Sequence, residues 1–313
     1  MKSQILKSPL PYLALIIAHT IWGANFVVAK VTLHEFPVLT LAFLRFALAA
    51  LLLTPFLLKL KPQQRKVEPK HIVKLFAAGL FFVTFNIFAF YEGLSRTLAI
   101  DASVLSLIVP IISILGGWLI LREKIYMVNF IGIILGLSGA FTIIILSNYQ
   151  GNAFATISIL GSLLILFSNF SAVLGEIMAK QMMKIYSPFL MTYIVFLIGA
   201  ITFFFPALYD YMQNPDWIKN VTILGVLGLL FITLLSSISA FFLLNYAISK
   251  VDIGKSSLFS YMEPAITASL AVPLLGERIS YSFIIGTCLI ILGVYWGTLG
   301  KPEHLRLHHK HHR

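Results

Sequence analysis

One block of sequence occurs twice in this chain, and this repeat limits the possible folds more than any other feature. Residues 95–132 and 249–286 align without a gap when the second block is shifted by 154 positions. The following residues coincide under that shift: Ser95 with Ser249, Ser103 with Ser257, Ser106 with Ser260, Pro110 with Pro264, Glu123 with Glu277, Gly132 with Gly286 and Gly139 with Gly293. Chance does not readily align Pro, Glu, Gly and Ser in so apolar a chain. We interpret the chain as an internal duplication.

The composition places the chain in a lipid bilayer. Of its 313 residues, 59% are hydrophobic and 11% are charged, so polar side chains are too few to cover a water-soluble globule of this length. The formal net charge of +11 would suggest a nucleic-acid partner in a soluble protein. Here the basic residues lie in short gaps between apolar runs. We therefore expect no nucleic-acid partner and interpret the positive charge as a signal of membrane topology.

Apolar runs recur along the chain at the length that a membrane-spanning helix needs, about 20 residues for about 30 Å of hydrocarbon. They cover roughly residues 10–31, 38–58, 72–94, 99–121, 126–147, 156–179, 188–208, 221–248, 255–275 and 279–299. The first run is too long for a signal-peptide core and no small-residue cleavage site follows it, so we expect it to be retained. The short gaps after residues 94 and 275 leave open one long hairpin in place of two separate spans.

The basic residues also indicate how these spans are oriented. Ten spans divide into five and five, and an odd number in each half inverts the second half relative to the first. If the N-terminus lies inside, 18 basic residues fall on cytoplasmic segments and four on the other side, namely Lys30, Arg96, Lys219 and Arg278. Because cytoplasmic loops are enriched in Lys and Arg, this distribution favours cytoplasmic termini. We predict an all-α membrane protein of the cell membrane, with ten transmembrane helices as two inverted five-helix repeats.

The expected organisation has three parts. A first repeat covers residues 1–150, a second covers 151–300, and a basic, His-rich cytoplasmic tail covers 301–313. The imidazoles of the tail would bind a divalent metal only adventitiously, so no metal site is predicted there. The longest internal basic stretch, residues 59–74, is expected to meet the anionic headgroups of the lipid bilayer.

The last span of each half has a pattern typical of close helix packing. Small residues occur there at intervals of four: Gly132, Gly136 and Ala140 in the first half, and Gly293 and Gly297 in the second. Small residues let helices approach closely in a bilayer. We expect these two helices to act as scaffold or as the contact of a homodimer. The alternative is that the small residues are scattered by chance.

Several short motifs together resemble the EamA family of the drug/metabolite transporter superfamily. They are IWGANFVVAK at 21–30, FLRFAL at 43–48 and the paired blocks that end in ILREK at 120–124 and LLGERI at 274–279. The resemblance covers about residues 10–299. It implies a transporter in which helices equivalent to 1–4 and 6–9 surround a central cavity, with the fifth and tenth outside. It implies no single substrate, because such relatives handle amino acids, amines, carboxylates, nucleosides and drugs. Arg122 stands where the family pattern has Gly, which leaves the expected fold unchanged.

On this basis we expect a secondary transporter, an exporter or exchanger, of small organic metabolites such as amino acids, carboxylates or amines. It would work by alternating access, with protons as a candidate coupling ion. A scaffold or a membrane-embedded enzyme remains the alternative class. The sequence has no HExxH or CxxC motif and no Ser beside a His-Asp pair, and His19 is the one deeply placed histidine. We therefore predict no catalytic residue and no cofactor.

Glu263 is the sharpest candidate for the site. It lies about eight residues into its expected span, or roughly 12 Å along the helix axis, which is near the middle of a bilayer. An ionised carboxylate at that depth costs at least ~2.5 kcal/mol, so it must face a wet cavity, meet a cation or be protonated. Pro264 follows directly and is expected to break the helix by freeing the carbonyl of Ser260. We predict that Glu263 binds the solute or carries the coupling proton, the alternative being a structural hydrogen bond.

Two further charged residues lie within expected spans. Arg45 is either a partner for Glu263 or for a carboxylate of the solute, or it extends along lipid to the outer surface. Glu176 is a second candidate for coupling. It lies four residues before Lys180, and an i,i+4 ion pair at the cytoplasmic boundary is the alternative explanation.

The remaining candidates are uncharged side chains that lipid would penalise, so most of them should face protein or a cavity. The predicted solute-binding residues of this kind are Trp22, Asn25, Asn86, Asn245 and Tyr261, and Asn169 shares their character. Trp22 and Asn25 lie three residues apart and therefore on nearly one helix face. For any single Asn, a hydrogen bond to a neighbouring helix is the alternative. Glu123 and Glu277, at helix ends beside basic residues, are interpreted as boundary ion pairs.

Overall fold

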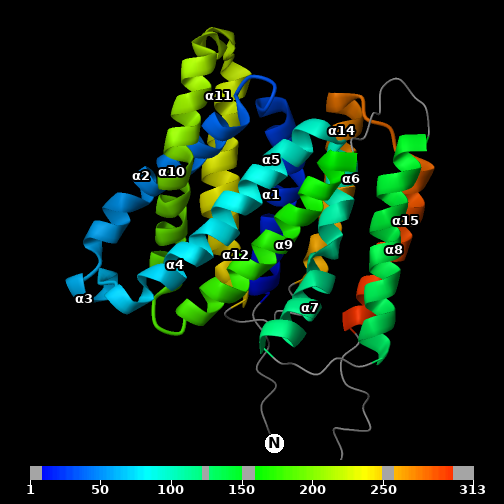
Figure 1. Ribbon diagram of the computed structural model, residues 1–313, viewed down its shortest axis with the longest axis horizontal. Coiled ribbons are helices and arrows are strands. Elements are labelled where there is room, and N and C mark those ends of the chain that lie inside the picture. Colours follow the sequence, from blue (N-terminus) through cyan, green and yellow to red (C-terminus); the bar gives the residue numbers. More distant parts are fainter. Residues whose placement is uncertain (1–8, 122–126, 150–158, 249–256, 299–313) are drawn as a thin grey trace, which may run out of the picture.

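The computed structural model describes residues 9–121, 127–149, 159–248 and 257–298. Within these ranges the chain forms helices and no strand, which agrees with the all-α prediction (Figure 1). The uninterrupted long helices are α1 (Leu10–Thr32), α2 (Val38–Lys59), α8 (Met127–Tyr149), α9 (Ile159–Met182), α10 (Pro188–Gln213) and α15 (Tyr281–Thr298). The remaining apolar runs consist of shorter helical pieces.

In the part of the chain that the structure describes, six helices are long and apolar enough to cross a membrane. They are Leu10–Thr32, Val38–Lys59, Pro62–Arg96, Ile159–Met182, Pro188–Gln213 and Ile223–Leu244. Shorter apolar helices occur at Ala99–Ser113, Phe130–Ile143 and Tyr281–Gly293. Residue 126 and residues 156–158, 255–256 and 299, which belong to expected spans, lie outside the described ranges.

Corresponding helices of the two halves are interrupted at corresponding places. In the first half α4 (Ile72–Gly79) continues into the π-helix η2 (Leu80–Phe85) and then α5 (Asn86–Arg96). In the second half α11 (Ile223–Leu230) continues into the π-helix η5 (Phe231–Ser239) and then α12 (Ala240–Ile248). Single π-turns are rare and occur often at functional sites. Because a π-helix interrupts the corresponding pass in each half, we interpret the two passes as copies that arose from the duplication.

The next element of each half is also irregular. After the extended residue Thr97, the chain forms α6 (Ala99–Leu105), the 3-10 turn η3 (Ser106–Ile108) and α7 (Val109–Leu121). Its counterpart begins with the 3-10 helix η6 (Ser257–Tyr261) and continues as α14 (Met262–Leu275). Short segments outside the apolar runs are α3 (Pro62–Arg65), η1 (Pro69–His71) and η4 (Pro215–Asn220).

The break that we expected at Pro264 lies at a different place. Since α14 begins at Met262, Pro264 is its third residue, in the first turn, where a missing backbone N–H needs no partner. The helix is interrupted by η6 just before it, and Glu263 is the second residue of α14 rather than a residue deep within a continuous helix. The prediction of an irregular backbone beside Glu263 is correct, but Pro264 does not cause it by disrupting a helix interior.

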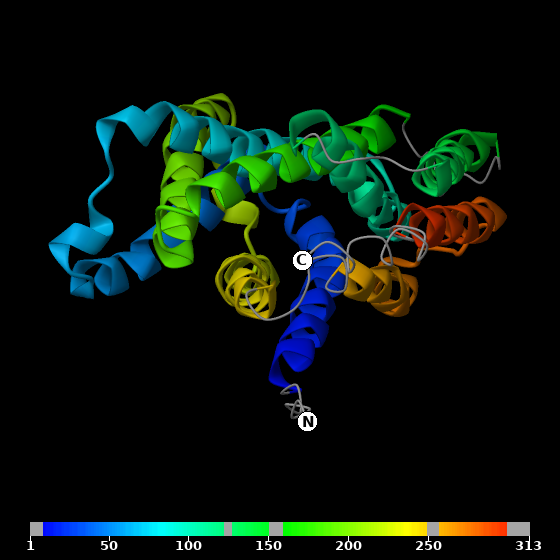
Figure 2. The same cartoon turned by 90° about the horizontal axis from the view of Figure 1, so that it is seen from below.

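The glycines of α8 and α15 pack these two helices against each other. A Cβ on Gly293 would lie 2.4 Å from the backbone nitrogen of Gly136, and one on Gly139 would lie 2.7 Å from the carbonyl oxygen of Gly286. Figures 1 and 2 show the pair side by side at one edge of the molecule, away from α2 and α10. These glycines are therefore used within the chain, in the scaffold role expected for the two helices.

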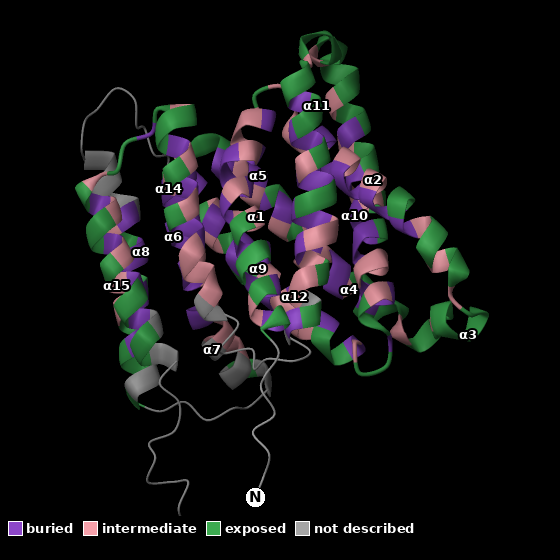
Figure 3. Cartoon of the chain, turned by 180° about the vertical axis from the view of Figure 1, so that it is seen from behind, coloured by how far each residue is buried: buried purple, intermediate pink, exposed green. Residues whose placement is uncertain are grey.

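The outer faces of the helices are apolar and exposed, whereas the faces between them are buried (Figure 3). Phe205 on α10, Ile223 on α11 and Leu51 on α2 expose 73%, 81% and 66% of their surface. Such a surface is unfavourable in water and favourable in hydrocarbon. The buried core contains polar residues as well, and the candidate site is built from some of them.

Candidate functional site

Glu263 forms a buried, hydrogen-bonded pair with His19, a residue far from it in the sequence. The imidazole Nδ1 lies 2.7 Å from Oε1 of Glu263, and the two residues are 5% and 8% exposed. His19 follows Leu10 by nine residues in the 23-residue helix α1, so the pair lies about 14 Å along that helix, near its middle. The carboxylate therefore meets a titratable partner at the depth that the sequence indicated for Glu263.

One ring nitrogen of His19 has no partner among the residues that the structure describes. Its Nε2 atom is buried and makes no hydrogen bond to any described residue. A buried polar atom without a partner is costly, and such atoms at a functional site are explained by a ligand or water. Sequence reasoning did not select His19 as a site residue. The signal that was present is its spacing of three residues from Trp22, which puts both on one face of α1.

Trp22 connects this pair to the π-helix η5. Its indole Nε1 donates to the carbonyl oxygen of Ser236 at 3.1 Å, and its ring meets the His19 ring edge-on, with centroids 5.4 Å apart. The other side of the indole contacts Phe241 of α12 in the same manner, at 5.6 Å. A π-helix alters the regular spacing of backbone hydrogen bonds. Here a carbonyl of that segment serves as the acceptor for a site residue.

Arg45 lies inside the protein rather than extending to the surface. It is 3% exposed, its Nε donates to Oγ of Ser237 at 2.6 Å, and one terminal nitrogen donates to the Tyr91 hydroxyl at 3.0 Å. The guanidinium also lies over the ring of Phe46, 5.2 Å from its centroid. Among the described residues no carboxylate lies within ion-pair distance of Arg45. Its charge is therefore met by hydroxyls and an aromatic face but by no anion.

Two adjacent serines of η5 accept hydrogen bonds from Trp22 and from Arg45. Ser236 accepts from Trp22, which contacts His19, and Ser237 accepts from Arg45. Both serines are at most 1% exposed. Trp22 of α1 and Arg45 of α2 thus contact adjacent residues of η5, and Trp22 in turn contacts His19, the partner of Glu263.

Two further predicted residues carry buried polar atoms without partners. Asn25, on α1, is 6% exposed, and its Oδ1 makes no hydrogen bond to a described residue. The hydroxyl of Tyr261, two residues before Glu263, is also buried and unpartnered among the described residues. These atoms resemble His19 Nε2 in being buried polar groups without a hydrogen-bond partner among the described residues.

Two other amide candidates, Asn86 and Asn169, each have a partner on a neighbouring helix. Asn86 accepts from Ser168 of α9 at 2.7 Å, and Asn169 donates to the carbonyl of Leu105 of α6 at 3.2 Å. Asn86 also donates to the carbonyl of Phe82, one turn earlier in its own pass, at 3.0 Å. Such contacts match the alternative role considered for lone Asn residues, which is to join helices.

For two other candidates, Glu176 and Asn245, the structure shows no contact that indicates a role. Glu176 is half-buried on α9 and makes no ion pair with Lys180 or with another described residue. The side chain of Asn245 lies outside the part of the structure that is described.

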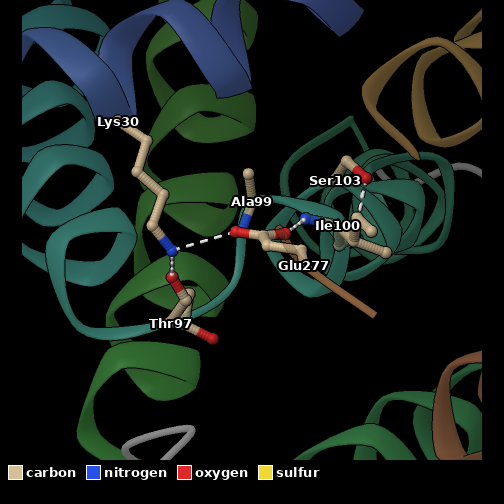
Figure 4. A network of polar contacts seen from close by, with 6 residues as sticks. All are labelled: Lys30, Thr97, Ala99, Ile100, Ser103 and Glu277. Atoms are coloured by element: carbon tan, nitrogen blue, oxygen red, sulfur yellow. Dashed lines mark hydrogen bonds and ion pairs between the residues drawn. The ribbon is translucent and has the colours of Figure 1, made fainter. Parts of the chain in front are cut away.

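The boundary acids also differ from each other. Glu277 pairs with Lys30 of α1, with 3.1 Å between Nζ and Oε1, rather than with a basic neighbour in its own segment (Figure 4). The interpretation of Glu277 as an ion-paired residue is therefore correct, but its partner comes from the opposite half of the chain. Glu123 lies outside the described residues.

Comparison with known proteins identifies the family. The model of the EamA-like transporter family matches residues 9–145 and 159–298. The chain belongs to this family. The resemblance drawn from its motifs is thereby confirmed, and EamA-like membership makes this protein a multi-pass membrane transporter rather than an enzyme.

Several known transporters match along nearly the whole chain. The uncharacterized transporter YetK of Bacillus subtilis is 27% identical over 302 residues, which cover 93% of this chain and 88% of YetK. A probable amino-acid metabolite efflux pump of Salmonella typhimurium is 26% identical over 300 residues, which cover 92% of this chain and 94% of the pump. One solved crystal structure superposes with a TM-score of 0.62 at 18% identity, covering 94% of this chain and 99% of the other, and shows a common fold.

Proposed function

We propose that this protein is a secondary transporter that exports or exchanges small organic metabolites by alternating access around the Glu263 and Arg45 region. The observation that carries the proposal is the buried pair of Glu263 and His19 near the middle of α1. Ionisable residues at that depth in a membrane protein are costly and mark solute or proton pathways. The family and its relatives named as efflux pumps support the same activity.

The charges of the site favour a solute that has both an anionic and a cationic group. Arg45 is buried and has no carboxylate partner among the described residues, and a planar guanidinium binds a carboxylate through two parallel hydrogen bonds. Glu263 would then take the ammonium group, or carry a proton when the solute lacks one. Amino acids and their derivatives have this pattern of charges, and two relatives are named probable amino-acid metabolite efflux pumps.

We propose that ten passes build this transporter, with residues 1–150 and 151–300 as inverted repeats in the plasma membrane. The six long apolar helices support part of this count. The paired interruptions at η2 and η5, and at η3 and η6, support a duplicated arrangement. Trp22 and Glu263 come from different repeats, as expected for a site at a repeat interface.

A topology assay tests this arrangement. A reporter fused after Lys301 or within residues 59–71 should be cytoplasmic, because the excess of basic residues lies on those segments. A reporter within residues 148–155 should lie on the opposite side, since an odd number of spans separates it from residues 59–71. Reporters at 59–71 and 148–155 that gave the same orientation would rule out the five-plus-five inversion.

Ligand binding and counterflow test the proposed activity. The purified protein is screened by thermal unfolding against amino acids, carboxylates, amines and nucleosides, because a ligand at 100 times its Kd adds about 2.7 kcal/mol to the stability. A stabilising solute is then measured by counterflow in proteoliposomes. We expect amino-acid-like zwitterions to stabilise the protein and to exchange across the vesicle membrane. Stabilisation without any exchange would indicate a binding protein or scaffold rather than a transporter.

A further inference from the structure

A second buried charge cluster lies at the end of the helices opposite to the N-terminus. Lys30, in the last turn of α1, donates from Nζ to the carbonyl oxygen of Thr97 and to Oε1 of Glu277, the latter at 3.1 Å (Figure 4). The side chains of Lys30 and Glu277 are only 16% and 4% exposed. In the proposed topology this is the outer side of the membrane.

The carboxylate of Glu277 joins this lysine to the start of α6. Its Oε1 accepts the backbone N–H of Ala99 at 2.8 Å, and its Oε2 accepts that of Ile100 at 3.0 Å. These two N–H groups belong to the first turn of α6 and have no acceptor within that helix. One carboxylate therefore holds together the end of α1, the beginning of α6 and the link that follows α14 at Gly276.

Asp101 adds a second carboxylate to this cluster. It is the third residue of α6, is 1% exposed, and its Oδ2 is buried without a partner among the described residues. Of the charged side chains on described elements packed around α6, Glu277 repels its charge and Lys30 attracts it. The backbone N–H groups of Ala99 and Ile100 are already taken by Glu277.

The cluster thus has one ammonium group for two carboxylates. Lys30 and Glu277 compensate each other, so an ionised Asp101 would be a further buried charge next to a like charge. Burying such a charge is costly, and a proton removes it.

We propose that Lys30, Glu277 and Asp101 form a proton-dependent latch that closes the outer end of the transporter and must break for the solute path to open there. The inference rests on the proposed alternating-access transport. While Asp101 holds a proton, the latch is neutral and closed. When the pH rises and Asp101 releases the proton to water, its repulsion of Glu277 weakens the contact between α6 and the other two segments.

The latch is joined to the central site by the helices that it holds. α1 carries His19 and Trp22, and α14 carries Glu263. Between the site and the latch, these two helices pack closely at Gly23, whose carbonyl accepts from the Thr267 hydroxyl at 2.8 Å. A Cβ at Gly23 would lie 2.8 Å from Ile266. A close contact between α1 and α14 therefore lies between the latch and the Glu263 pair.

Cysteine accessibility tests the latch directly. The reporter is Thr97→Cys in a Cys288→Ser background, because Thr97 is 4% exposed and its hydroxyl makes no hydrogen bond to a described residue. Reconstituted protein without solute is labelled with a membrane-impermeant maleimide at several pH values. The pH effect of the reagent itself is removed by normalising to a thiol on an exposed surface position.

We expect slow labelling of the reporter at low pH and faster labelling as the pH rises. Lys30→Met should raise the rate at low pH about tenfold or more, because one partner of a buried ion pair is removed. Glu277→Gln should also raise the labelling rate at low pH, while its amide oxygen can still accept a hydrogen bond from α6. It is the second test variant if Lys30→Met does not fold. Asp101→Asn should give slow labelling that no longer depends on pH.

The matched control is Lys219→Met, because Lys219 pairs with Asp216 on the same side of the fold with both side chains mostly exposed. It should leave the labelling rate unchanged. Unchanged labelling in folded Lys30→Met or Glu277→Gln would overturn the latch, and a retained pH dependence in Asp101→Asn would overturn the role of its proton. Since labelling needs no solute, these outcomes are independent of whether Glu263 and Arg45 support transport.

Discussion

Replacing Glu263 with Gln lowers transport of a cationic or zwitterionic solute by about 100-fold or more at every pH. The amide keeps an oxygen that accepts from Nδ1 of His19, so the contact between α1 and α14 remains while the negative charge is lost. The carboxylate is the proposed partner of the positive group of the solute, and removing one partner of a buried, hydrogen-bonded charge pair weakens binding by about 2–5 kcal/mol, with about 1.4 kcal/mol for each factor of ten. Initial rates of uptake into proteoliposomes over a range of pH measure this effect.

The same variant separates solute recognition from proton coupling. If the solute carries no positive charge, Glu263→Gln should abolish the response to a proton gradient while exchange of solute against solute persists. Glu68→Gln is the control, since Glu68 pairs with Lys70 in an exposed segment and should not affect the rate. A Glu263→Gln protein with wild-type rate, selectivity and pH profile would reduce Glu263 to a structural hydrogen bond. The search for the site would then move to Trp22 and Asn25.

Replacing Arg45 with Met weakens the binding of carboxylate-bearing solutes by about 100-fold, because the buried guanidinium is their proposed counter-charge. Solutes without a carboxylate should be much less affected. The Kd from ligand-dependent thermal unfolding measures the loss. Arg96→Met is the matched control, since the Arg96 guanidinium is exposed and pairs with Glu92 on the same helix.

The ligand-free stability of Arg45→Met distinguishes a functional charge from a structural one. A buried charge that awaits a ligand destabilises the empty protein, and a well-packed apolar replacement is often neutral or stabilising by about 1–4 kcal/mol. We therefore expect an unchanged or higher melting temperature together with lost binding. A large fall in melting temperature with equal loss for all solutes would show that Arg45 serves the packing of α2 against α5 and η5.

The sequence predicted several residues of the candidate site but not the contacts between them. Glu263 and Arg45 were predicted because each is a charged residue within an apolar run. Their partners were not, because His19 is 244 residues from Glu263, and Ser237 is 192 residues from Arg45. A local pattern holds no information on which distant polar groups will meet. Asn86 and Asn169 show the reverse, since their contacts with neighbouring helices match the alternative considered for them.

By itself the sequence determined the solvent, the class of fold and the duplication. Apolar runs of about 20 residues can satisfy their backbone in lipid only as helices, and this holds whatever their neighbours are. The gapless match of residues 95–132 with 249–286 shows the repeat without any structure. Only the tertiary structure decided that Glu263 meets His19, that Lys30 meets Glu277 across 247 residues and that η2 and η5 are π-helices. The physical reason is that the insertion of a helix into hydrocarbon depends on the composition of that segment alone. The stability of a buried charge depends instead on its partner, and only the packing of the helices determines which partner that is.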